Sequence, residues 1–124
     1  MSGRQKKILI IDDEPDVVAY LTAFFIDNGF EVVSASNGKE GFHLALSEAP
    51  DLITLDITMP EETGIRLLGE LKDEAATRQV PVIIITGTPG ISNQQIDHAP
   101  TAFFEKPIDR QELLEKIRRI LVMN

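Results

Sequence analysis

Short, nearly continuous apolar runs recur along the chain, and longer amphipathic stretches separate them. The runs are rich in valine and isoleucine, which is typical of strands buried on both faces of a parallel sheet. They occupy residues 7–11, 31–35, 51–55, 80–85 and 101–104. The sequence therefore predicts five short, buried strands.

The amphipathic stretches predict helices between these strands. They cover residues 15–28, 38–48, 64–75 and 110–122. Their large apolar residues recur three and four positions apart, the spacing that places side chains on one helical face. In the second stretch this places Phe42, Ala45 and Leu46 together.

Capping signals support two of these boundaries. Asn28-Gly29 is typical of a helix that ends with a left-handed residue. Asp109, with Glu112 three residues later, resembles a capping box at the start of the last helix.

The segment from 87 to 100 does not follow the pattern. Its large apolar residues, Ile91 and Ile96, are five apart and do not form a helical stripe. Pro89 and Pro100 disfavour helical backbone near its two ends. We therefore expect an atypical or short fourth helix here, with low local stability and high mobility.

The alternation of strands and helices predicts an α/β fold. Such a chain forms a parallel sheet with helices on both faces and right-handed crossovers. A doubly wound, flavodoxin-like sheet of five strands commonly has the order 2-1-3-4-5, and its site lies at the carboxyl ends of strands 1 and 3. The chain has 124 residues, so we expect a single domain over residues 1–124.

Polar residues follow four of the predicted strands at the same end. Asp12 and Asp13 follow the first strand, Asp56 the third, Thr86 the fourth and Lys106 the fifth. Three carboxylates that converge on one edge either have raised pKa values or bind a cation. Oxygen ligands without His or Cys favour Mg²⁺. An aspartate nucleophile, a hard cation, a lysine and a hydroxyl together suit phosphoryl transfer.

Each of these residues also has an ordinary structural interpretation. Alone, Asp12 or Asp13 is more simply a cap of the first helix, and Asp56 is equally well a turn residue. Thr86 is more often just a strand end, and Lys106 a solvated surface lysine. Their placement at the same end of different strands is what favours the functional interpretation.

Composition limits the partners and the compartment. The net charge of −8 argues against direct binding to nucleic acid or to anionic membrane, because both would repel the protein. The chain has no cysteine, which removes disulfides, thiolate catalysis and cysteine-ligated zinc. No apolar run approaches the ~20 residues of a membrane span, so we expect a cytoplasmic protein.

Four motifs carry a resemblance to a known family: LIIDDEPDV, LITLDITMPEETGIRLL, PVIIITGT and FFEKPID. With this order and spacing, the chain resembles the CheY-like receiver domains of two-component response regulators from about residue 7 to 122. The resemblance implies that Asp56 accepts a phosphoryl group from a sensor histidine kinase or a histidine phosphotransfer protein. Such a domain catalyses only its own phosphorylation and dephosphorylation. It then regulates a partner or a C-terminal output domain, and a homodimer is among the states that the family adopts.

The resemblance also implies a role for each residue of the site. Mg²⁺ is held by acids and one backbone carbonyl, which match Asp12, Asp13, Asp56 and Thr58. Lys106 and Thr86 match the residues that contact the phosphoryl oxygens. Thr86 and Phe103 match the conformational switch, with Phe in place of the more usual Tyr. The Lys106-Pro107 bond matches one that is typically cis.

Three other interpretations are weighed against this one. A phosphatase of the haloacid dehalogenase type needs a second Asp two residues after the nucleophile, where this chain has Thr58. A flavodoxin-type flavin module needs a phosphate-binding loop after the first strand, where this chain has the acidic sequence DDEPD. A non-phosphorylated pseudo-receiver scaffold is expected to have lost an acid, the threonine or the lysine, and this chain keeps them all.

Overall fold

The strands form one parallel sheet that follows the apolar runs. The computed structural model of the chain describes residues 5–58, 64–87 and 101–122. The strands are β1 (Lys7–Ile11), β2 (Glu31–Ala35), β3 (Leu52–Asp56), β4 (Val82–Thr86) and β5 (Ala102–Glu105). Their order is β2-β1-β3-β4-β5, and every neighbouring pair is parallel. The expected doubly wound sheet and its strand order are confirmed.

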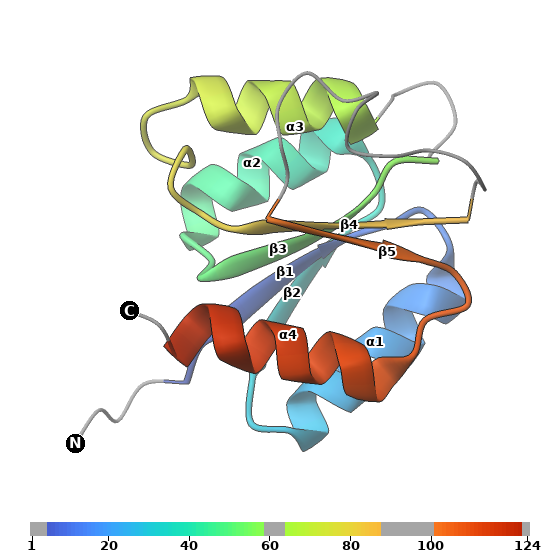
Figure 1. Cartoon of the computed structure of the whole chain (residues 1–124). Coiled ribbons are helices and arrows are strands. Elements are labelled where there is room, and N and C mark those ends of the chain that lie inside the picture. The colour runs from blue at the N-terminus through green and yellow to red at the C-terminus, as the bar shows by residue number, and fades with distance from the viewer. Residues whose placement is uncertain (1–4, 59–63, 88–100, 123–124) are drawn as a thin grey trace.

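The helices cover the sheet on both faces. They are α1 (Pro15–Asp27), α2 (Gly38–Glu48), α3 (Gly64–Asp73) and α4 (Arg110–Val122). Helices α2 and α3 lie on one face of the sheet, and α1 and α4 lie on the other (Figure 1). None of the described helices has the length and apolar character needed to cross a membrane. The atypical helix expected between 87 and 100 lies outside the described residues beyond Gly87.

Side-chain caps fix the starts of two helices. The side chain of Asn37 accepts a hydrogen bond from the backbone N–H of Glu40 at 2.8 Å, which begins α2. Asp109 Oδ1 accepts from the backbone N–H groups of Gln111 and Glu112, each at 3.1 Å, and begins α4. These bonds satisfy N–H groups that have no partner within the helix itself.

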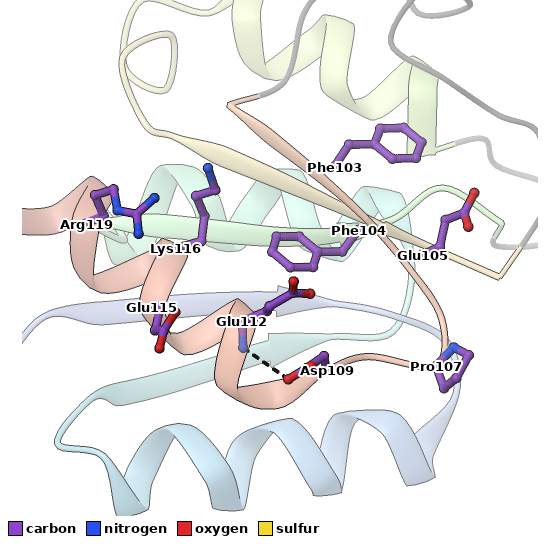
Figure 2. Close-up of a pocket in the computed structure, with 9 residues that line it drawn as sticks. All are labelled: Phe103, Phe104, Glu105, Pro107, Asp109, Glu112, Glu115, Lys116 and Arg119. Carbon is purple, nitrogen blue, oxygen red and sulfur yellow. Dashed lines mark hydrogen bonds between the residues drawn. The ribbon is translucent and has the colours of Figure 1, made fainter.

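The core forms two apolar layers, one on each face of the sheet. Alternate residues of a strand point to opposite faces. Ile8 of β1 therefore joins the layer under α1 and α4, and Leu9 joins the layer under α2 and α3. Phe103 and Phe104 of β5 are separated in the same way (Figure 2). This alternation decides which side chains approach the carboxyl edge from each face.

Helix α2 contradicts one expectation. Leu46 is 43% exposed and Ala45 only 3%, so the sequence was wrong to group Leu46 with Ala45. The buried residues of α2 are instead small: Gly38, Gly41 and Ala45. A Cβ on Gly41 would lie 2.8 Å from Ile11 Cδ1, so α2 packs closely on β1 through its small residues and turns Leu46 to solvent.

Candidate acidic site at the carboxyl edge of the sheet

Three carboxylates converge where β1 and β3 end. Asp12 and Asp13 directly follow β1, and Asp56 is the last residue of β3. One oxygen from each of the three carboxylates lies within 4.8 Å of the others. Asp12 and Asp56 are almost completely buried, and Asp13 is partly exposed. The backbone N–H of Asp12 donates to Ala35 at 3.1 Å, which extends the pairing of β1 with β2 into the site.

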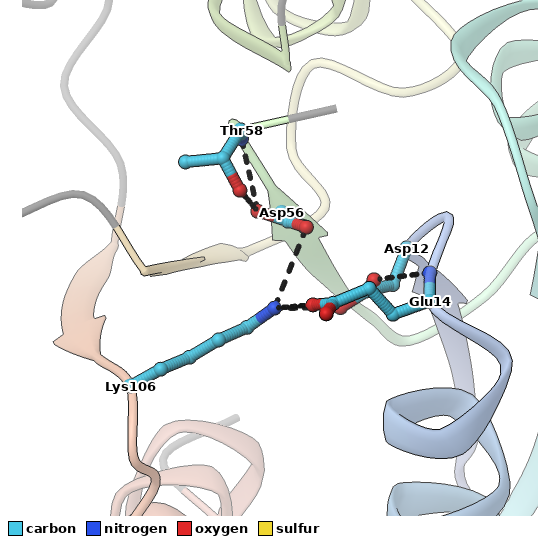
Figure 3. Close-up of polar contacts among 5 residues, drawn as sticks. All are labelled: Asp12, Glu14, Asp56, Thr58 and Lys106. Carbon is cyan, nitrogen blue, oxygen red and sulfur yellow. Dashed lines mark hydrogen bonds and ion pairs between the residues drawn. The ribbon is translucent and has the colours of Figure 1, made fainter. Parts of the chain in front are cut away.

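A single lysine reaches into this cluster from the end of β5. Lys106 Nζ lies 3.4 Å from Asp12 Oδ2, 3.5 Å from Asp56 Oδ2 and 2.6 Å from Glu14 Oε1 (Figure 3). Its backbone N–H donates to the carbonyl of Thr86 at 2.7 Å, so pairing with β4 sets where the side chain begins. Among the residues that the structure describes, the lysine therefore has three carboxylate partners.

Asp56 is held in one orientation by its own turn. Its Oδ1 accepts two hydrogen bonds from Thr58, one from the backbone N–H at 2.9 Å and one from Oγ1 at 2.6 Å. Its Oδ2 is the oxygen that faces Lys106 (Figure 3). The two oxygens of Asp56 thus have different surroundings, one bound by neutral donors and one beside a cation.

The charges of the site do not balance. The pKa of Asp12 is raised to about 6, mainly by burial and also by the charge of Asp56, although the Glu14 backbone N–H and Lys106 act in the opposite direction. Burial lowers the pKa of Lys106, but the hydrogen bond to Glu14 and the charges of Asp12 and Asp56 outweigh burial and raise it overall. The site retains an excess of negative charge, which a proton or a cation can neutralise.

The ligand atoms available here suit a hard divalent cation. All three acids of the cluster offer oxygen, and the cluster contains neither His nor Cys. Such a donor set fits Mg²⁺, which binds through a few carboxylates and keeps several waters. The acidic cluster is therefore consistent with a magnesium site.

The two expected switch residues lie toward the face of the sheet that α2 and α3 cover. Thr86 is fully buried and lies two residues beyond Ile84, which belongs to the layer under α2 and α3. Phe103 is partly buried against the same layer. The Lys106-Pro107 peptide bond is cis.

Two contacts of the site were not predicted from the sequence. Glu14, which makes the shortest contact to Lys106, was not considered as a site residue. Thr58 was considered only for its carbonyl, and its hydroxyl bond to Asp56 was missed. The sequence DDEPD did contain a signal for Glu14, because glutamate is not among the residues that favour the N-cap position.

Comparison with known proteins agrees with the fold and identifies the family. The family model of the response regulator receiver domain matches residues 8–118. The chain belongs to this family. The receiver family expected from the four sequence motifs is therefore confirmed.

Relatives and solved structures match nearly the whole chain. Protein PilH of Pseudomonas aeruginosa is 35% identical over 121 residues, which are 93% of this chain and 97% of PilH. A CheY-like receiver domain protein of Methanospirillum hungatei superposes with a TM-score of 0.89 at 27% identity, over 97% of this chain and 96% of that one. The response regulator TrrA of Thermotoga maritima, solved in complex with Mg²⁺-BeF, gives 0.80 at 29% identity, over 94% and 100%.

Other curated relatives are longer than this chain. It spans 26% of the length of the response regulator PleD of Caulobacter vibrioides and 51% of the length of the response regulator Rre1 of Synechocystis. The family thus includes receiver domains within larger proteins.

Proposed function

We propose that this receiver domain accepts a phosphoryl group on Asp56, in a reaction that depends on Mg²⁺. The observation that carries the proposal is the environment of Asp56. The residue is buried, one of its oxygens is fixed by Thr58, and the other faces Lys106 at 3.5 Å. Asp12 and Asp13 lie beside it. The phosphoryl donor is a sensor histidine kinase or a histidine phosphotransfer protein.

The transfer exchanges one bond to phosphorus for another. An oxygen of Asp56 forms the O–P bond while the P–N bond of the donor's phosphohistidine breaks. Lys106 pairs with the charge on the transferred phosphoryl oxygens, and the Thr86 hydroxyl donates to one of them. Mg²⁺ would be held by Asp12, Asp13, Asp56 and the backbone carbonyl of Thr58, and when bound it neutralises charge on the phosphoryl oxygens. The domain catalyses only its own phosphorylation and dephosphorylation.

The switch then connects the carboxyl edge of the sheet with the apolar layer under α2 and α3. When the Thr86 hydroxyl moves toward the phosphoryl group, it leaves space in the layer where Phe103 packs, and Phe103 rotates inward. The placement of Thr86 and Phe103 toward the same apolar layer supports this coupling.

The proposed setting is a cytoplasmic two-component pathway. The output is an interaction with a partner or with a C-terminal output domain, and a homodimer is one form that it takes. The net charge of −8 supports a protein partner and not direct contact of this domain with nucleic acid or membrane. A non-phosphorylated scaffold is not favoured, because all the acids, the threonine and the lysine are present.

Intact-mass spectrometry with a small phosphodonor tests the proposal. Wild type and Asp56→Asn are incubated with acetyl phosphate, each with Mg²⁺ and with EDTA. Only wild type with Mg²⁺ should gain the mass of one phosphoryl group. Equal incorporation into Asp56→Asn would reject Asp56 as the acceptor, and equal incorporation with EDTA would reject the metal requirement.

A further inference from the structure

Lys106 rests nearest to the carboxylate that is easiest to release. Glu14 Oε1 lies 2.6 Å from Lys106 Nζ, whereas the closest oxygens of Asp12 and Asp56 lie at 3.4 and 3.5 Å. The Glu14 side chain is 58% exposed, compared with 4% for Asp12 and 2% for Asp56. Glu14 can therefore turn into solvent without exposing core or leaving a buried charge, which neither aspartate can do.

Helix capping does not explain a glutamate at this position. Glu14 is the N-cap residue of α1, and its side chain makes no capping hydrogen bond. Ser, Thr, Asp or Asn would stabilise the helix here by accepting from its first N–H groups. The backbone N–H of Glu14 donates to Asp12 Oδ1 at 2.9 Å, and that bond is independent of the side chain. What the side chain does instead is bind Lys106, which lies 92 residues further along the chain.

We propose that Glu14 is a positioning residue that holds Lys106 in the resting state and competes with the phosphoryl group for it. The inference rests on the proposed function, in which Lys106 pairs with the phosphoryl oxygens. Each phosphorylation then requires Lys106 to exchange the Glu14 carboxylate for a phosphoryl oxygen. Loss of that contact opposes phosphorylation, so Glu14 sets how readily the site accepts the group.

The expected size of the effect is modest. The Glu14 carboxylate is largely solvated, and a solvated ion pair contributes little free energy. It should therefore compete only weakly with the phosphoryl group for Lys106. Removing the carboxylate should tighten binding of a phosphoryl mimic about two- to fivefold.

Titration with beryllium trifluoride, a non-covalent phosphoryl mimic, measures this competition without turnover. Backbone amide shifts are followed by NMR at saturating Mg²⁺, so that differences in metal affinity do not contribute. The variants are Glu14→Gln, which keeps the shape of the side chain, and Glu14→Ser, which also supplies a capping hydroxyl. The matched control is Asp16→Asn, which makes the same charge change two residues away in the exposed first turn of α1.

Both Glu14 variants should bind the mimic more tightly than wild type, and the control should stay within about twofold of it. Because Glu14→Ser should be at least as stable as wild type, a failure of that variant to bind more tightly cannot be attributed to unfolding. Unchanged or weaker binding in both Glu14 variants would overturn the inference while leaving the proposed function intact. An equal gain in Asp16→Asn would also overturn it, because general charge would then be the cause. If wild type fails to bind the mimic at all, the proposed function fails, and this inference fails with it.

Discussion

At the amino edge of the sheet charged groups are matched with partners, whereas at the carboxyl edge several carboxylates share one lysine. Lys7 and Asp51 illustrate the amino edge. The backbone N–H of Lys7 donates to Asp51 Oδ2 at 2.8 Å, and the backbone N–H of Asp51 donates to the Lys7 carbonyl at the same distance. Lys7 Nζ then pairs with Glu48 at 3.0 Å. The charged groups of Lys7 and Asp51 thus have partners that the protein itself supplies.

Polar side chains near the end of α3 also have hydrogen-bond partners within the protein. Lys72 Nζ donates to the carbonyl of Val80 at 3.0 Å, and the fully buried Thr77 donates from Oγ1 to the carbonyl of Leu71 at 2.6 Å. Burial lowers the pKa of Lys72. The comparison teaches that polar groups at the amino edge stabilise the fold by themselves, whereas those at the carboxyl edge need a cation or a proton from outside.

The largest expected effect comes from the backbone packing beneath the carboxyl edge. A Cβ on Gly64 would lie 2.6 Å from Ile57 Cα and 2.7 Å from the carbonyl oxygen of Asp56. Backbone atoms cannot move aside as a flexible side chain can, so Gly64→Ala should destabilise the protein by about 3 kcal/mol. Urea unfolding measures this change.

Gly87 provides the control at the same edge. A Cβ there would lie 3.7 Å from Lys106 Cδ, an ordinary contact. Gly87→Ala should therefore change the free energy of unfolding by less than about 0.5 kcal/mol. If the two alanine variants were equally stable, the close approach of α3 to the end of β3 would be wrong.

The next largest effect concerns Mg²⁺. Both oxygens of Asp12 already have partners, the Glu14 N–H and Lys106, whereas Asp13 is partly exposed beside them. Asp13→Ala should therefore weaken Mg²⁺ binding more than Asp12→Ala, by about tenfold or more relative to wild type. Calorimetric titration of both variants decides the order, with the exposed Asp16→Ala as control. Unchanged affinity in Asp13→Ala would remove it from the metal site.

Thr77, which follows α3, and Thr54, in the middle of β3, test whether a buried hydroxyl stabilises the fold only when it is hydrogen-bonded. Thr77→Val removes the buried bond to Leu71 and should cost about 1–2 kcal/mol. Among the described residues Thr54 Oγ1 is buried without a hydrogen-bond partner, so Thr54→Val should be neutral or stabilising by up to about 1 kcal/mol. Thermal unfolding of both variants compares the same substitution in two settings. Equal losses of stability in the two variants would mean that the hydrogen bond of Thr77 does not stabilise the fold.

A smaller effect should appear as a pH dependence of the Mg²⁺-free protein. The pKa of Asp12 is raised to about 6, so between about pH 4 and 6 the native state holds a proton that the unfolded chain releases. The contribution of Asp12 to stability is therefore complete at the acidic end of this window and is lost as pH rises through it. Asp12→Asn should remove that slope and be about 1 kcal/mol more stable than wild type at pH 7. Parallel pH profiles of wild type and variant would show that Asp12 does not titrate in this way.

Much of the fold follows from local pattern in the sequence. Continuous apolar runs predicted the strands, and the order of the sheet was the one that five-stranded doubly wound sheets commonly have. Asp12, Asp13, Asp56 and Lys106 were predicted to converge because they lie at the ends of three different strands, all at the same edge of the sheet. These inferences need only the spacing of apolar residues, the order of the elements along the chain and the topology of a parallel sheet.

What could not be predicted depends on packing and side-chain direction. The spacing of Leu46 groups it with Phe42 and Ala45, but α2 packs on β1 through Gly41, and Leu46 is exposed. The bond between Glu14 and Lys106 joins residues 92 positions apart and depends on the conformation of two flexible side chains. No local pattern specifies such a contact.

The central claim is that Asp56 accepts the phosphoryl group, and its chemical location is the most direct test. Borohydride reduces an aspartyl phosphate to homoserine, which peptide mass spectrometry then locates. Wild type treated with acetyl phosphate and Mg²⁺ should contain homoserine at position 56 and aspartate at positions 12, 13 and 51. Homoserine at any of those other positions, or none at position 56, would contradict the account.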